Sequence, residues 1–317
     1  MDVGELIATG GLAEEIKSEC PFKDDVFGVD SVEPEDIKDD IDAAQKQQDN
    51  DGGVLGRNLV NASNGAEGTV GGPCPPPDAQ KVERGDTKRK GICVMVPGTG
   101  TIPEGIYGFT VAAHHLIPGE ASLEPSPLKP YMTKDQSVEV QTKEGKKTKK
   151  IRKHIGYNVN GAHNGVWLPG SYYIRRSTSP IKGKTWSDLG ENPWCLTYVA
   201  SVVKAAGGQF HDAHTKYSEA VKDLLAKIEK ILSQHECDQC KPSDINPPFK
   251  IKNRLYNLSK YLRGQVTAPP SVWKRPWFTS DRWRDDAFSA GRPSGKFIAA
   301  YLKAKVVNIS TPGNFGD

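Results

Sequence analysis

An apolar, strand-forming run that ends in two adjacent histidines and a proline constrains this chain most. It extends from Phe109 to Ile117, contains His114 and His115, and stops at Pro118. Its aromatic and β-branched residues predict a strand, which the proline ends. Successive side chains of a strand point to opposite faces, so we expect the two imidazoles to have different roles. One would bind a metal while the other accepts a proton, or both are structural histidines at a strand end.

A second group of polar residues lies at 158–169. Asn164 and Gly165 form a tight-turn dipeptide, and the following Val-Trp-Leu predicts a short strand that stops at Pro169. An asparagine amide at such a turn can hold a histidine ring in one tautomer by accepting its Nδ1–H. A plain β-turn is the alternative.

A third group begins an amphipathic helix. His211 and His214 are three residues apart, and we expect them on one side of its first turn, with Asp212 as N-cap. The alternative is that both histidines are capping or surface residues. The apolar face that follows recurs at helical spacing and consists of Ala220, Val221, Leu224, Leu225, Ile228, Ile231 and Leu232.

The charges are strongly separated along the chain. Residues 1–80 carry 18 acidic and 5 basic side chains, a formal charge of −13, whereas the remainder carries 21 and 37, a charge of +16. A basic body indicates a polyanionic partner. Seven of the eleven residues at 143–153 are basic. They form either a solvated hairpin tip or a phosphate-binding surface. The expected nucleic-acid contacts are Lys146, Lys147, Lys149, Lys150 and Arg152.

Composition predicts three regions. Residues 1–90 are acidic, and 50–77 are rich in Gly, Asn and Pro, which predicts linker or irregular structure there. A helix at 31–48 remains an alternative. Residues 91–240 contain the histidines and begin with a predicted buried strand at 92–96, and residues 241–317 form a C-terminal extension that ends in a predicted helix at 296–307.

Several other classes of protein are disfavoured. No apolar run is long enough to span a bilayer, and the first twenty residues lack the pattern of a secretory signal. Six cysteines, widely spaced except for one pair, do not indicate a disulfide framework, so we expect a reducing cytoplasm. Cys237 and Cys240 are a lone Cys-x-x-Cys pair that would need distant ligands to hold zinc. Trp273, Trp277 and Trp283 lie among basic residues, and we expect them to pack on the core rather than stack on bases.

Taken in order, the motifs are Ala113-His114-His115, the segment 164–169, and His211-x-x-His214-x-x-Tyr217. Over residues 106–232 this order resembles the AHH branch of the His-Me finger (HNH) nuclease superfamily. The resemblance implies an α+β fold with a ββα-metal nuclease core, an irregular acidic N-terminal region and a helical C-terminal extension.

The same resemblance implies roles for individual residues. His114 and His214 would bind one divalent metal ion, with His211 as a third ligand or a catalytic phosphate contact. His115 would be the general base, and Asn164 would orient it. Magnesium is the expected ion, with zinc, nickel and manganese as alternatives.

The implied function is a metal-dependent, non-specific DNA endonuclease. Members of this branch are often toxin domains of bacterial polymorphic or type VI secretion effectors with a cognate immunity protein. We therefore expect synthesis in the bacterial cytoplasm without a signal peptide, delivery into a target cell, and docking of residues 1–90 on a secretion component or adaptor. The alternatives are a ribonuclease of the same fold and a non-enzymatic nucleic-acid- or zinc-binding protein.

Overall fold

The computed structural model describes residues 3–12, 20–22, 50–65, 92–99, 102–171, 186–189, 192–234, 243–248, 250–290 and 292–308. The chain forms two compact units, each assembled from three separate stretches. The first unit comprises 1–50, 115–164 and 218–262, and the second comprises 51–114, 165–217 and 263–317. The predicted region boundaries at 90/91 and 240/241 lie outside the described residues.

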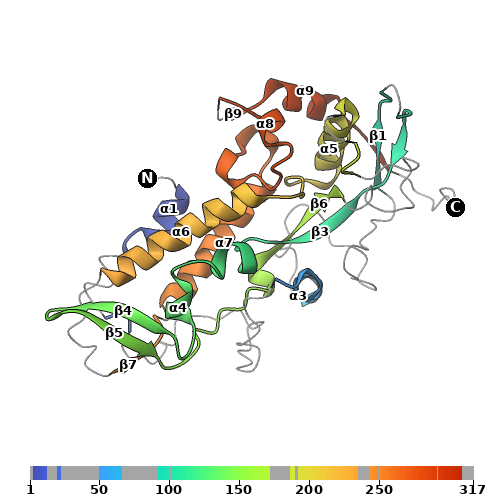
Figure 1. Ribbon diagram of the computed structural model, residues 1–317. Coiled ribbons are helices and arrows are strands. Elements are labelled where there is room, and N and C mark those ends of the chain that lie inside the picture. The colour runs from blue at the N-terminus through green and yellow to red at the C-terminus, as the bar shows by residue number, and fades with distance from the viewer. Residues whose placement is uncertain are drawn as a thin grey trace. The chain divides into compact units, whose positions relative to one another are not determined.

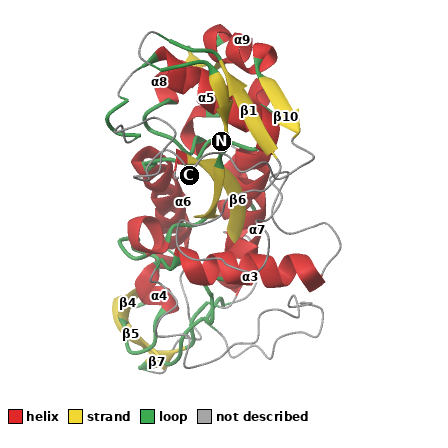
Figure 2. Ribbon diagram, turned by 90° about the vertical axis from the view of Figure 1, so that its right-hand side faces the viewer, coloured by secondary structure: helices red, strands yellow, loops and turns green. Residues whose placement is uncertain are grey.

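One sheet of the second unit has the strand order β10-β1-β2. Both pairings of β1 (Ile92–Val96) are antiparallel, with β2 (Gly105–Tyr107) and with β10 (Lys305–Asn308). The helices α5 (Pro193–Ala206) and α9 (Gly295–Lys303) pack together, and α5 also contacts β1 (Figure 2). The prediction of a strand at 92–96 is confirmed.

The final helix is shorter than the prediction. It ends at Lys303, and the chain then pairs with β1 as β10, so the predicted helix at 296–307 was wrong beyond that residue. Lys204 of α5 donates to the carbonyl oxygens of Leu302 and Ala304, at 2.8 and 2.9 Å. These bonds satisfy acceptors that the end of a helix leaves open. Pairing with a distant strand therefore overrides the local helical pattern.

A second sheet of this unit pairs β3 (Thr110–His115) with β6 (Gly165–Gly170), as Figure 1 shows. The predicted strand before the two histidines is confirmed. All six residues of β6 are buried, and the strand continues through Pro169 instead of stopping there. A proline can lie inside a strand where its missing N–H is not needed for pairing. The carbonyl of Pro169 still accepts from the amide of His211, at 2.7 Å.

Helix α3 (Gly52–Gly65) packs on β6. The prediction of linker or irregular structure was wrong for these residues. The Asp51 carboxylate caps the helix by accepting from the second and third following amides, at 2.8 and 2.9 Å. Leu55 and Leu59 are fully buried, and a Cβ built on Gly165 would lie 2.6 Å from Leu55 Cδ1. The absence of a side chain at Gly165 thus lets α3 approach the strand.

The first unit contains the basic hairpin. Strands β4 (Ser137–Thr142) and β5 (Gly145–Ile151) are antiparallel, and β7 (Asp244–Ile245) adds to β5 in parallel. The interpretation of 143–153 as part of a hairpin is therefore confirmed. Helix α4 (Lys129–Met132) packs beside it.

Three longer elements complete the first unit. They are α1 (Val3–Thr9), the part of α6 (Thr215–Ser233) from residue 218, and the part of α7 (Lys250–Thr267) up to residue 262. A π-helical turn (Gly119–Leu123) and a 3-10 turn (Ala162–Asn164) lie in the connections. Lys227 of α6 forms an ion pair with Glu5 of α1, at 2.8 Å.

The C-terminal tryptophans lie in the core of the second unit. Trp273, Trp277 and Trp283 are 3%, 2% and 2% exposed, so the prediction that they pack on the core is confirmed. The chain after Trp283 forms three short elements, namely α8 (Arg284–Ala287), β8 (Phe288–Ser289) and β9 (Arg292–Pro293). The C-terminal extension therefore contains strands as well as helices.

Two further predictions lie outside the described residues, the helix at 31–48 and the Cys237–Cys240 pair. Among the described helices, none has the length and apolar character required to cross a membrane.

Candidate metal centre and catalytic histidine

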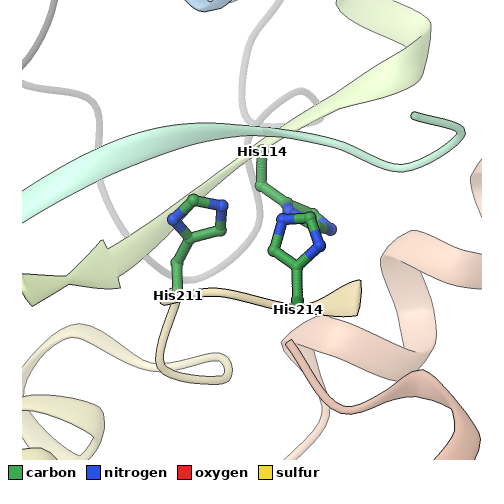
Figure 3. A group of neighbouring side chains, drawn as sticks. All are labelled: His114, His211 and His214. Atoms are coloured by element: carbon green, nitrogen blue, oxygen red, sulfur yellow. The ribbon is translucent and has the colours of Figure 1, made fainter. Parts of the chain in front are cut away.

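Three histidines from separate parts of the sequence meet in the second unit. His114 points from β3 toward His211 and His214, which lie on the segment that leads into α6 (Figure 3). The ring centroid of His114 is 5.1 Å from that of His211 and 4.9 Å from that of His214. Each ring offers one nitrogen such that all three nitrogens lie within 4.8 Å of one another. The structure thus brings together the three metal ligands expected from the sequence.

The backbone before α6 is held in place by β6 and by the segment 279–281. His211 forms a parallel bridge with Gly170 of β6. The amide of Asp212 donates to the carbonyl of Thr279, and the amide of Asp281 donates to the carbonyl of Ala213, at 3.1 and 2.6 Å. These contacts fix the chain at His211 and at the two residues after it, which supports the position of its ring.

Two glycines turn the chain from α5 back to β6. Gly207 and Gly208 have φ values of 77° and 72°, in the left-handed region that glycine adopts without strain. A Cβ on Gly208 would also lie 2.9 Å from Leu168 Cδ2. This reversal carries the following residues to the strand, where His211 pairs with Gly170.

The two helix-associated histidines precede α6 instead of lying on its first turn. The helix begins at Thr215, so the expected placement of His211 and His214 within it was wrong. Asp212 is also not its cap, because its carboxylate accepts from Trp186 Nε1, at 2.7 Å. The cap is Asp281, whose carboxylate accepts from the amide of Thr215 at 2.5 Å. Sequence spacing did not reveal Asp281 because it lies 66 residues away from the amide that it caps.

The environment of the cluster favours neutral imidazole. Burial lowers the pKa of His214, although a backbone hydrogen bond and the negative charges of Asp281 and Asp212 act in the opposite direction. His114 is 1% exposed. A metal binds the neutral form of histidine. The cluster is therefore suited to hold a cation.

His115 is described within the first unit, where it meets a different asparagine from the expected one. Its Nε2 lies 2.8 Å from Oδ1 of Asn160. Asn160 belongs to the polar stretch at 158–169, in which the resemblance had implied Asn164 for this role. The structure thus identifies Asn160 as the residue positioned to orient the His115 ring.

Asn164 is buried and connects backbone segments. Its Nδ2 donates to the carbonyls of Ile117 and Val159, at 2.9 and 2.8 Å. Its Oδ1 accepts from the amide of Ile117 at 2.8 Å and from the hydroxyl of Ser259 at 3.0 Å. Among the described residues, its side chain forms no hydrogen bond with His115. The chain also differs locally from the prediction, because Asn164 ends the 3-10 turn and β6 begins at the next residue.

The five basic residues expected at the phosphates lie on or directly after β5. Lys146 and Lys150 form exposed ion pairs with Glu139 and Asp135, at 3.1 and 2.9 Å. Lys147 also forms an ion pair, with Glu144, and Lys149 is 6% exposed. Arg152 is exposed. Exposed ion pairs are weak, so a phosphate can replace the acids, but the arrangement also fits the solvated hairpin.

Comparison with protein-family models gives a match. Residues 103–255 match the model of AHH, a nuclease family of the HNH/ENDO VII superfamily with conserved AHH. This part of the chain, just under half of its length, is similar to the AHH nuclease family. Neither the curated proteins nor the solved structures yielded a match.

The AHH match covers the candidate site. Ala113-His114-His115, the segment 164–169 and both His211 and His214 fall within residues 103–255. The predicted family and the α+β fold of a ββα-metal nuclease are thereby confirmed. In chain order β3, β6 and α6 supply the two strands and the helix.

Proposed function

We propose that this AHH nuclease is a metal-dependent endonuclease that hydrolyses phosphodiester bonds of DNA. The observation that carries the proposal is the cluster of His114, His211 and His214, with nitrogens within 4.8 Å, inside the region matched by the nuclease family. Ligand nitrogens lie about 2.0–2.1 Å from a bound zinc ion, so two of them are at most about 4 Å apart. Small rotations of the three rings would close the remaining difference.

The ligand set favours a transition metal. Imidazole suits zinc, nickel, copper and iron, whereas magnesium prefers carboxylate and water oxygens. The nearby carboxylates of Asp212 and Asp281 accept hydrogen bonds from Trp186 and from backbone amides. We therefore propose zinc or nickel in preference to the magnesium expected from the sequence. Such an ion supplies Lewis-acid stabilisation of charge on the scissile phosphate and the leaving 3′ oxygen.

We propose His115 as the general base. It follows His114 directly on β3, where neighbouring side chains face opposite sides. When Nε2–H donates to Asn160 Oδ1, Nδ1 retains a lone pair. That nitrogen accepts a proton from water as the water oxygen bonds to phosphorus and the P–O3′ bond breaks. The leaving oxygen then takes a proton from solvent.

Plasmid cleavage by the EDTA-stripped full chain tests these roles, with zinc, nickel, manganese and magnesium added back separately. His115→Ala should retain one bound metal ion, measured by isothermal titration calorimetry, and lose cleavage by at least about 100-fold. His114→Ala should lose both. His154→Ala is the matched control, since that histidine is not among the proposed site residues and accepts a hydrogen bond from the amide of Lys134. Wild-type cleavage by His115→Ala, or retained metal in His114→Ala, would contradict the assignment.

The choice of DNA over RNA is part of the proposal. Its support is the family resemblance and the +16 charge of residues 81–317, which suits a phosphate backbone of either kind. Parallel digestion of duplex DNA and of single- and double-stranded RNA distinguishes the two. Exclusive cutting of RNA would replace the proposal with a ribonuclease that uses the same residues.

We further propose that the nuclease acts as an antibacterial effector with a cognate immunity protein. The support is the resemblance of its motifs to toxin domains, and the acidic residues 1–80 offer a docking segment for a delivery partner. Induced expression in a bacterial host should lower colony counts for the wild type and leave them unchanged for His115→Ala. Equal survival with both proteins would count against the effector role.

A further inference from the structure

A groove of about 860 Å³ lies along α7 in the first unit, beside the end of α1. From α7 it is lined by Lys250, Asn253, Arg254, Asn257, Lys260 and Tyr261. These residues recur every three or four positions, which places them on one face of the helix. All six carry hydrogen-bond donors, and three of them are cations.

The charged residues in the described lining of the groove are all basic. The sequence of α7 contains five Lys or Arg residues and no acid, and the described residues that line the groove include no acid. Glu5, the acid of the adjoining helix α1, bonds to Lys227 of α6 instead, at 2.8 Å. Among the described residues, α7 and the lining of the groove therefore carry a net positive charge.

The wall of the groove is held by a buried cation. Arg254 is 8% exposed, and its Nη1 donates to the carbonyl of Gly10 at 3.1 Å. That bond ties the end of α1 to α7. The side chains around Arg254 are exposed, namely those of Asn253, Asn257 and Lys260. The groove therefore combines one buried cation that is held in place with accessible hydrogen-bond donors.

The spacing of the charges matches a phosphate backbone. Lys250 and Lys260 are ten residues apart, which is about 15 Å along a helix. One strand of duplex DNA places a phosphate about every 3.4 Å along the axis, so the groove spans about four phosphates. Lys, Arg, Asn and Tyr side chains are the groups that commonly contact phosphate and sugar without reading sequence.

We propose that this groove on α7 binds the sugar-phosphate backbone of the nucleic-acid substrate. The proposal rests on the proposed function, because the ligand is the substrate of the histidine centre. It assigns to α7 a role in substrate binding separate from that expected for the basic hairpin. The donors lie in a row, as a polymer of evenly spaced anions requires.

Binding of a fluorescein-labelled 20-base-pair duplex to the full chain in EDTA tests the groove without cleavage. Fluorescence anisotropy is followed from 50 to 200 mM salt. Lys250→Gln/Lys260→Gln should bind about tenfold or more weakly near 0.1 M salt, with a salt slope lower by about 2, because two phosphate contacts are lost. Lys230→Gln/Lys303→Gln is the charge-matched control, since both lysines are exposed and lie outside the groove. It should bind like the wild type.

A second variant tests whether weaker binding comes from the groove itself or from a folding defect. Asn253→Asp/Asn257→Asp changes exposed positions and should weaken binding by repulsion, with an unchanged far-UV circular dichroism spectrum. Equal affinity and slope for the groove variants and the control would overturn the proposal. It would also be overturned if the variants lost affinity for labelled polyglutamate but kept it for the duplex, since the groove would then serve an acidic polypeptide.

The outcomes separate the two proposals. If the wild type binds and cuts DNA while the groove variants bind normally, the groove assignment fails and the nuclease stands. If the wild type binds no duplex even at 50 mM salt, both proposals fail. Loss of binding in the groove variants, with normal binding by His115→Ala, supports the groove independently of catalysis.

Discussion

The different surroundings of Asn164 and Asn160 predict different consequences when each amide is removed. Asn164 is completely buried, and its side chain forms four hydrogen bonds at 2.8–3.0 Å. A net contribution of about 1 kcal/mol for each bond gives a loss of about 4 kcal/mol in the free energy of unfolding for Asn164→Ala. That is a large share of the roughly 5–15 kcal/mol that stabilises a typical protein. Asn160→Ala removes the bond to His115 and should cost about 1 kcal/mol while reducing cleavage.

The unfolding assay for these variants must report on the first unit, which contains both asparagines. All six tryptophans fall in the second unit, whereas Asn164 and its partners lie in the first. Urea unfolding should therefore be followed by far-UV circular dichroism, which detects both units, and by tryptophan fluorescence, which reports on the second. With a slope of about 3 kcal/mol per M, Asn164→Ala should lower the dichroism midpoint of the first unit by about 1.3 M. A midpoint equal to that of Asn160→Ala, with cleavage abolished, would refute this reasoning and restore Asn164 as the residue that orients the base.

Three further perturbations test the fold around the site. Asp281→Ala removes the cap of α6 and should lower the free energy of unfolding by about 1 kcal/mol, measured by thermal unfolding. Calorimetric titration should also show weaker metal binding, because the segment that carries His211 and His214 loosens. Unchanged metal affinity would contradict a link between the cap and the metal centre. Gly165→Ala should destabilise the second unit by about 1–3 kcal/mol through a clash with Leu55. Gly264→Ala, in open space on a helix, should instead stabilise the protein by about 0.5–1 kcal/mol. Equal melting temperatures of the two variants would refute the packing argument. Burial raises the pKa of Cys195 from its ordinary value of 9.0 to about 11, so the unfolded thiol ionises first and stability should fall as pH rises from about 9 to 11. Cys195→Ala should lose less stability than the wild type over that range, and identical pH profiles would refute this.

Some features follow from local sequence alone. The strand that ends at His115 and the amphipathic helix α6 were predicted because apolar periodicity and proline act over a few residues. The order of the motifs also identified the nuclease family, since the side chains that define it lie within short segments. A hairpin was also one of the two interpretations of the basic run at 143–153, and β4 and β5 pair there.

Other features depend on how distant segments meet. Residues 52–65 are weakly apolar and rich in Gly and Asn, and they form α3 because Leu55 and Leu59 bury their side chains against β6. Residues 305–308 leave a helical pattern because β1 offers backbone partners. Tertiary burial and pairing outweigh a local preference worth less than about 1 kcal/mol per residue.

The residues of the candidate site show the same division. Sequence alone selected His114, His115, His211 and His214, because histidine chemistry and motif order are visible in the chain. The tertiary structure decided that Asn160 meets His115. The physical reason is the distance along the chain over which each feature is decided. Whether a residue can bind a metal depends on its own side chain, which the sequence gives directly. Which side chain 45 residues away it contacts depends on the path of the backbone between them.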